Sequence, residues 1–214
     1  MSEQALREDI VAVAQAIDKA GFCPSKSGNV SARFGDGFLL TPSGLPYART
    51  KPEDLIHVAL DGTVLSGSRK PSSEWPFHVA IYKARPDAQA IVHTHSPRAT
   101  ALSCARRGIP AFHYMIALCG GADVRCADYA TFGSPELAEN AVRALEGRKA
   151  VLLANHGVIA LGASLAGAHT IVAEVENLAG QYLDLLASGL EPVILDAAEM
   201  ERVSAKFAGY GKVG

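Results

Sequence analysis

Two short apolar runs, residues 90–92 and 150–154, constrain the fold of this 214-residue chain more than any other feature. Each run is too short for a typical helix and contains no polar residue, which is the pattern of a buried strand. The first run leads into His93-Thr94-His95, and the second leads into Asn155-His156-Gly157. The chain is therefore expected to form a sheet that is covered by other elements, with histidines where two of its strands end.

Helical patterns lie on both sides of these runs. Apolar residues recur at helical spacing in residues 5–20, 74–85, 164–188 and 196–208. Ser96-Pro97 and Ser134-Pro135 each place a capping hydroxyl before a proline, which predicts two more helices of about a dozen residues. Asp61-Gly62 predicts a tight hairpin between strands at 55–60 and 63–65. Since no linker or repeat interrupts this order, residues 1–214 are predicted to form a single α/β domain of three layers.

The histidines are candidate metal ligands. Side chains two residues apart in a strand point to the same face, with Cα atoms about 6.6 Å apart, so His93 and His95 can reach one metal ion. His156 follows the second buried run and offers a third imidazole. Three histidines leave one position of a tetrahedral zinc ion open, which is typical of a catalytic site. The alternative for each histidine alone is a polar residue at a strand end or in a turn.

Glu74 is predicted at the N-terminus of the 74–85 helix, where the helix dipole favours an ionised carboxylate. Beside a zinc ion it would serve as a fourth ligand or as a general acid and base. The alternative is an ordinary glutamate of the first helical turn. His78 follows Glu74 by four residues, so the two share a helix face, and a local hydrogen bond is the simpler explanation for this histidine.

Three polar turns are candidate anion sites. They are Ser27-Gly28-Asn29, Thr41-Pro42-Ser43-Gly44 and Pro71-Ser72-Ser73. Backbone N–H groups and small hydroxyls in such turns can converge on phosphate oxygens, although each turn alone is a weak signal. Neither a GxxxxGK[ST] motif nor a GxGxxG motif after a strand is present, so a nucleotide is not indicated.

Composition excludes several classes of protein. The net charge of −2 and the absence of a basic stripe argue against nucleic acid as a partner. No apolar run approaches the ~20 residues of a membrane span, and the first residues lack a signal-peptide pattern, so no membrane partner is expected. The four cysteines show no CxxC pair, which favours reduced thiols and a cytoplasmic location.

Taken together, the motifs resemble those of the class II aldolase/adducin family. The matching segments, in family order, are SGNVSAR (27–33), TPSGLPY (41–47), PSSEWPFH (71–78), VHTHS (92–96), IPAFHYMIA (109–117), YATFG (129–133), NHG (155–157) and KFAGYG (206–211). The resemblance covers nearly the whole chain. It implies an α/β/α fold around a mainly antiparallel sheet, a strand direction that periodicity does not determine.

The resemblance also implies roles for individual residues. His93, His95, His156 and Glu74 would bind Zn²⁺, with Mn²⁺ or Co²⁺ as other possible metals, and Glu74 would give way to substrate and act as acid and base. The substrate phosphate would bind Gly28, Asn29, Ser43, Gly44, Ser72 and Ser73. Tyr114 would relay a proton from a neighbouring subunit of a homotetramer with active sites at its interfaces. Phe132, Phe207 and Tyr210 would surround the aldehyde end.

The activity that the resemblance implies is cleavage of a 5-deoxy-type ketose 1-phosphate into dihydroxyacetone phosphate and an aldehyde, as in carbohydrate metabolism or methylthioribulose salvage. L-Fuculose 1-phosphate, 5-deoxyribulose 1-phosphate and 5-methylthioribulose 1-phosphate all remain open, because apolar pockets separate such substrates poorly. Members that cleave fuculose phosphate have threonine in place of Ser43 and histidine in place of Asn155. Alternatives are a pentulose-5-phosphate 4-epimerase, a methylthioribulose-1-phosphate dehydratase, a sugar-acid phosphate decarboxylase, or a non-catalytic adducin-like module.

Overall fold

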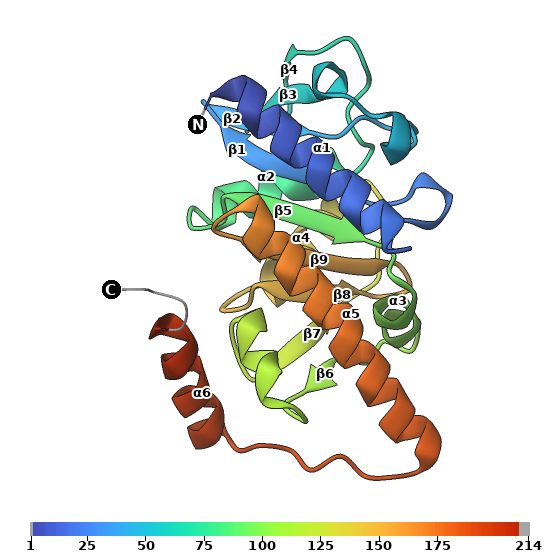
Figure 1. Cartoon of the computed structure of the whole chain (residues 1–214), viewed down its shortest axis with the longest axis vertical. Coiled ribbons are helices and arrows are strands. Elements are labelled where there is room, and N and C mark those ends of the chain that lie inside the picture. The colour runs from blue at the N-terminus through green and yellow to red at the C-terminus, as the bar shows by residue number, and fades with distance from the viewer. Residues whose placement is uncertain (1, 210–214) are drawn as a thin grey trace.

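The strand-forming segments pair into one sheet in the computed structural model, which describes residues 2–209 (Figure 1). The nine strands of this described part are β1 (Asn29–Phe34), β2 (Gly37–Leu40), β3 (Ile56–Ala59), β4 (Val64–Ser66), β5 (Ala90–Thr94), β6 (Ile109–Pro110), β7 (Asp123–Ala127), β8 (Ala150–Leu153) and β9 (Gly157–Gly162). Their order is β4-β3-β2-β1-β5-β9-β8-β7-β6. Only β7 and β8 run parallel, which confirms the mainly antiparallel sheet.

Helices cover both faces of this sheet. They are α1 (Glu3–Lys19), α2 (Trp75–Ala84), α3 (Pro97–Cys104), α4 (Pro135–Ala144), α5 (Leu165–Ser188) and α6 (Ala197–Gly209). The first apolar core lies under α1, α3 and α5, and the second lies under α2 and α4. In Figure 1, α1 and α5 cross the near face of the sheet, with α2 and α4 behind it. The predicted three-layer α/β/α architecture is therefore confirmed.

Alternation along β5 decides which way the first histidine points. Ala90 and Val92 belong to the core under α1 and α5, whereas Ile91 belongs to the core under α2 and α4. His93 continues the second set, because strand side chains alternate between faces. Its fully buried ring meets Phe77 of α2 edge-on, with the ring centroids 5.4 Å apart. The buried strand predicted from residues 90–92 thus places the side chain of His93 on the face of the sheet that α2 covers.

Most predicted elements occur within a few residues of their expected bounds. The Asp61-Gly62 turn joins β3 to β4, and Gly62 adopts the positive φ of 92° that such a turn requires. The helices after Ser96 and Ser134 are shorter than expected, at 8 and 10 residues. The 3₁₀ segment η4 (Tyr114–Cys119) and the short strands beside it carry no clear periodicity. None of the helices within residues 2–209 has the length and apolarity needed to cross a bilayer.

Glu176 of α5 anchors the helix that follows the His93–His95 segment. Its buried carboxylate accepts hydrogen bonds from the backbone N–H groups of Arg98 (3.0 Å) and Ala99 (2.9 Å) at the start of α3. Glu176→Ala is expected to lower the free energy of unfolding by about 2–3 kcal/mol, because charge-assisted hydrogen bonds are lost and buried donors are left unpaired. Urea denaturation measures this, with Asn177→Ala on the exposed face as the control. Equal stability of the two variants would contradict the expectation.

Candidate metal centre and anion pocket

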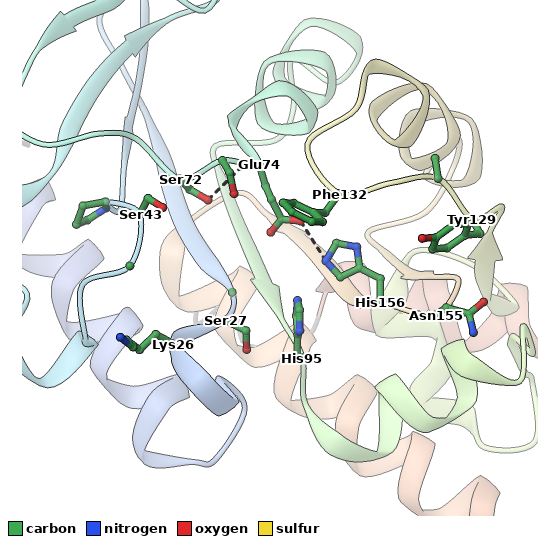
Figure 2. Close-up of a pocket in the computed structure, with 15 residues that line it drawn as sticks. Lys26, Ser27, Ser43, Ser72, Glu74, His95, Tyr129, Phe132, Asn155 and His156 are labelled. Atoms are coloured by element: carbon green, nitrogen blue, oxygen red, sulfur yellow. Dashed lines mark hydrogen bonds and ion pairs between the residues drawn. The ribbon is translucent and has the colours of Figure 1, made fainter.

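Four potential metal ligands come together from three parts of the fold. Glu74 is the N-cap residue of α2, His93 lies on β5, His95 follows that strand, and His156 lies in the turn between β8 and β9. Thr94 pairs with Val158 across β5 and β9, which brings the two histidine-bearing ends into register. Figure 2 shows Glu74, His95 and His156 pointing toward one another. The fold therefore assembles the predicted set.

The distances within this cluster match the edges of a metal coordination shell. Glu74 Oε1 lies 3.0 Å from His156 Nε2, and Glu74 Oε2 lies 3.1 Å from His93 Nε2. His93 Nε2 and His95 Nε2 are 3.1 Å apart, and one donor atom from each of the four residues lies within 4.8 Å of all the others. Bonds of 2.0–2.1 Å in a tetrahedral zinc site would place ligand atoms about 3.3 Å apart. The residues fit a divalent metal.

The hydrogen bonds around the cluster support this fit. His93 Nδ1 lies 2.9 Å from the carbonyl oxygen of Val158, to which it donates, so its Nε2 lone pair faces Glu74 and His95. Metal-binding histidines commonly donate their other ring N–H to such an acceptor. Glu74 Oε1 is buried and accepts no hydrogen bond, although His156 Nε2 lies close to it. Both atoms are instead available to a shared ion.

Electrostatics favour the metal-binding protonation states of Glu74 and His95. Burial alone would raise the pKa of the Glu74 carboxyl, but the close imidazoles of His93 and His156 outweigh it and hold that pKa below its ordinary value. Burial and the same two histidines lower the pKa of His95 to about 3, against an opposing effect of Glu74. A metal needs an ionised carboxylate and neutral imidazoles, and the pKa shifts of Glu74 and His95 favour these two states.

A cavity of about 290 Å³ opens beside the cluster. The predicted phosphate residues that line it are Gly28, Ser43, Gly44, Ser72 and Ser73. Gly28 and Gly44 adopt φ angles of 83° and 72°, and a Cβ atom at Gly28 would lie 2.6 Å from the carbonyl oxygen of His93. Residues of the three polar turns thus meet in one wall of the cavity.

Asn29 occupies a different place from the other predicted phosphate residues. It lies on β1 directly opposite His93 and is fully buried, outside the lining of the cavity. Its Nδ2 donates to Ser72 Oγ (3.1 Å) and to Glu74 Oε2 (2.9 Å). Asn29 therefore connects the anion wall to the candidate metal ligands from behind.

The residues predicted around the aldehyde end and the predicted proton relay, Tyr114, are dispersed. Phe132 is exposed and lines the cavity beside the cluster. Tyr114 and Phe207 lie in a separate cavity between η4 and α6, where their rings stack with centroids 6.4 Å apart. The two cavities share no lining residue among residues 2–209. Tyr210 lies outside the described residues.

Residues to which the sequence analysis gave no individual site role also line the cavity. Lys26 is the one lysine among its described lining residues, and both it and Ser25 adopt positive φ angles (66° and 56°). Ser27 Oγ is buried without a hydrogen-bond partner. Tyr129 and Asn155 form the opposite wall (Figure 2). The position of Lys26 just before the Ser-Gly turn was the available signal, but its backbone conformation is not visible in a sequence.

His78 departs from its predicted local role. It makes no hydrogen bond with Glu74, although the two are four residues apart, and bonds instead to Asn29 and Ser31 of β1. The prediction was wrong because Glu74 lies at the N-cap with non-helical ψ of 11°, so its side chain does not follow the helix face. His78 is completely buried between α2 and the sheet.

Buried His78 makes the metal-free protein sensitive to acid. Burial and nearby His93 lower the pKa of His78 to about 3, with Glu74 opposing them. The unfolded chain binds this proton near pH 6.5, so stability should fall as the pH drops below about 6.5, by up to about 1.4 kcal/mol per pH unit from this residue. Urea denaturation at two mildly acidic pH values should give a shallower pH dependence of stability for His78→Gln than for the parent protein. Identical slopes in the two proteins would refute the assignment.

Comparisons with known proteins agree with this geometry. The profile described as the class II aldolase and adducin N-terminal domain matches residues 8–183. The chain is 50% identical over 210 residues to a 5-methylthioribulose-1-phosphate/5-deoxyribulose-1-phosphate aldolase of Rhodospirillum rubrum, covering 98% of this chain and 94% of the relative. It is 43% identical to a 5-deoxy-D-ribulose 1-phosphate aldolase of Bacillus thuringiensis, with 96% and 97% covered. A solved L-fuculose 1-phosphate aldolase superposes with a TM-score of 0.93 at 40% identity, covering 97% of this chain and 98% of that one.

Proposed function

The chain belongs to the class II aldolase and adducin family, and from this premise we propose that it is a metal-dependent aldolase that cleaves a ketose 1-phosphate into dihydroxyacetone phosphate and an aldehyde. The observation that carries the proposal is the convergence of Glu74, His93, His95 and His156 beside a polar cavity. A non-catalytic adducin-like module would have no need of such a cluster. Residues 1–214 act as one unit in this proposal.

The substrate is a 5-deoxy-type ketose 1-phosphate. The relatives named above act on 5-methylthioribulose 1-phosphate, 5-deoxyribulose 1-phosphate and L-fuculose 1-phosphate. The extensive identity with the R. rubrum enzyme favours the first two for this chain. Exposed Phe132 and Tyr129 offer an apolar wall that fits a methyl or methylthio group.

The phosphate binds at the wall formed by Gly28, Ser43, Gly44, Ser72 and Ser73, with Asn29 supporting it from behind. Backbone N–H groups and hydroxyls bind the phosphate oxygens there. Lys26 adds a positive charge from the rim of the same cavity. This arrangement directs the carbonyl end of the substrate toward Glu74 and the histidines.

His93, His95, His156 and Glu74 hold the metal, for which zinc fits the nitrogen-rich donor set. When bound, it supplies Lewis-acid stabilisation of the negative charge that develops on substrate oxygens. Tyr114 assists the loss of the C4 hydroxyl proton to solvent, and the C3–C4 bond breaks. Glu74 takes up a proton from solvent and gives it to C3, a role that fits an ionisable group beside the reacting atoms.

Tyr114 acts from a neighbouring subunit of a homotetramer. Its side chain is half exposed, and it lies in a cavity that shares no lining residue with the metal cluster in the described part of the chain. Mixing subunits that carry Tyr114→Phe with subunits that carry Glu74→Gln should restore part of the activity, because some of the mixed interfaces pair an intact Tyr114 with an intact Glu74. Activity that stays at the level of the parent variants would place Tyr114 in its own subunit's site.

Product analysis tests the proposed activity. The protein is incubated with each of the three ketose 1-phosphates, and release of dihydroxyacetone phosphate is followed in a coupled assay. A chelator should abolish the release and zinc should restore it. No release from a zinc-loaded protein would overturn the proposal, and detection of an epimer, a dehydrated sugar or carbon dioxide would identify one of the alternative chemistries.

The protein functions in the cytoplasm in this proposal. The support is chemical: Cys23, Cys104, Cys119 and Cys126 are all free thiols, which is typical of a reducing compartment.

A further inference from the structure

A buried polar network leads from the core of the molecule to Glu74. It consists of Tyr82 and His78 on α2 and of Ser31 and Asn29 on β1, each at most 1% exposed. Tyr82 Oη and Ser31 Oγ are 2.8 Å apart, Ser31 Oγ and His78 Nδ1 are 2.8 Å apart, and His78 Nε2 and Asn29 Oδ1 are 2.5 Å apart. Asn29 Nδ2 completes the path at 2.9 Å from Glu74 Oε2.

The carboxylate fixes the direction of every hydrogen bond in this network. Ionised Glu74 can only accept, whether or not a metal is bound, so Asn29 must turn its amide nitrogen toward Glu74 and its oxygen toward His78. His78 must then donate from Nε2. It is neutral because burial lowers its pKa to about 3, so Nδ1 carries a lone pair.

The remaining two bonds follow from this tautomer. Ser31 donates its single hydroxyl proton to His78 Nδ1, and Tyr82 donates to Ser31. Burial raises the pKa of Tyr82, so its hydroxyl keeps the proton. The rings of Phe38 and Phe77 stack on His78 and exclude other partners from its faces. Only one arrangement of protons satisfies all four residues.

This network orients groups and does not conduct protons. Asn29 stands between His78 and Glu74, and a side-chain amide cannot pass a proton without forming its unstable imidic tautomer. Asn29 also donates to Ser72 Oγ, so the orientation of its amide fixes the positions of both Ser72 and Glu74, which face the cavity. A donor at His78 Nε2 is therefore needed to hold Asn29 in the one rotamer that serves both Glu74 and Ser72.

We propose that His78 is a positioning residue, which acts through Asn29 to hold the Glu74 carboxylate in the geometry needed for metal binding and proton transfer. The role in proton transfer rests on the proposed aldolase function. The role in metal binding stands independently of it, because it depends only on the contacts of Asn29 and Glu74.

Substitutions at His78 test the proposal. His78→Leu fills the space of the ring with an apolar side chain of similar volume and removes the donor to Asn29. His78→Gln supplies an amide N–H as the donor to Asn29. His57→Leu is the matched control, since His57 is a partly buried histidine on β3 that bonds to the Phe34 carbonyl oxygen and lies outside the cavity lining. The readouts are zinc affinity, by competition with a chromophoric chelator, and the kcat and KM of dihydroxyacetone phosphate release.

We expect His78→Leu to weaken zinc binding and to lower kcat by about 10- to 100-fold, the range typical of residues that orient metal ligands. His78→Gln should recover most of this loss, and His57→Leu should leave zinc affinity unchanged. Folded His78→Leu protein with the zinc affinity of the parent would overturn the proposal. If the parent protein shows no aldolase activity but His78→Leu still weakens zinc binding, the proposed function is rejected and the positioning role of His78 stands.

Nuclear magnetic resonance of the unmodified protein provides a test that does not depend on the folding of a variant. Long-range ¹H–¹⁵N spectra of histidine-labelled protein should show His78 protonated at Nε2 and unprotonated at Nδ1, with no titration while the protein stays folded. A proton at Nδ1, or a charged ring, would contradict the direction of the network and with it the proposal.

Discussion

Replacing His156 with alanine is expected to lower kcat/KM for ketose 1-phosphate cleavage by at least about 10³-fold, since loss of a Lewis acid removes several kcal/mol of stabilisation. His156 supplies one of three imidazole nitrogens around Glu74, and its Nε2 lies 3.0 Å from Glu74 Oε1. Two histidines and a carboxylate bind zinc more weakly than the complete set. The purified variant should therefore contain far less metal than the parent.

The position of His156 makes this variant informative. The residue lies in the turn between β8 and β9 and not inside a strand, so its removal should disturb the fold less than removal of fully buried His93. His169→Ala, on α5, is the control for loss of a histidine elsewhere. Metal analysis and the coupled assay are made on the same samples. If the variant keeps both its zinc and its activity, His156 is not a metal ligand.

Glu74→Gln is expected to lower kcat by about 10²- to 10⁴-fold, the usual contribution of a general acid and base. Glutamine has the shape of glutamate and can still accept from Asn29 Nδ2, so the buried surroundings should remain intact. It cannot be ionised and cannot carry the proton that C3 must receive. Three histidines remain to bind the metal, so zinc should be retained at reduced affinity.

A partial reaction separates this chemical role from binding. In D₂O, and without an aldehyde, the parent should exchange hydrogen for deuterium at the carbon of dihydroxyacetone phosphate that becomes C3. Proton nuclear magnetic resonance follows the exchange directly. Zinc-loaded Glu74→Gln should exchange at least about 10²-fold more slowly. Exchange at the parental rate would show that another group moves this proton.

The sheet shows how far periodicity reaches in predicting the fold. The runs at 90–92 and 150–154 identified buried strands because no polar side chain interrupts them, and β5 and β8 lie where these runs predicted. Periodicity carries no information on strand direction, so the antiparallel sheet came from the family resemblance. The region from β6 to β7 was not predicted, because its two-residue strand and 3₁₀ segment have too few residues to show a period.

The candidate site shows the same division between local and distant information. His93 and His95 were identifiable as a pair because both belong to one short segment. The exposed positions of Phe132 and Tyr114 in separate cavities were not visible in the sequence, since cavities form between elements far apart in the chain. Lys26 was missed because a left-handed backbone at a lysine has no signature in residue type.

The sequence by itself predicted most of the helices and strands, the candidate metal ligands and, through its ordered motifs, the family. Each of these depends on residue type and spacing along a short stretch of chain. Only the tertiary structure decided that Asn29 supports Glu74 from behind the cavity wall and that His78 bonds across 49 residues to Asn29. The physical reason is that hydrogen-bond partners of buried polar groups are chosen by the packing of α2 against β1, which no local pattern encodes.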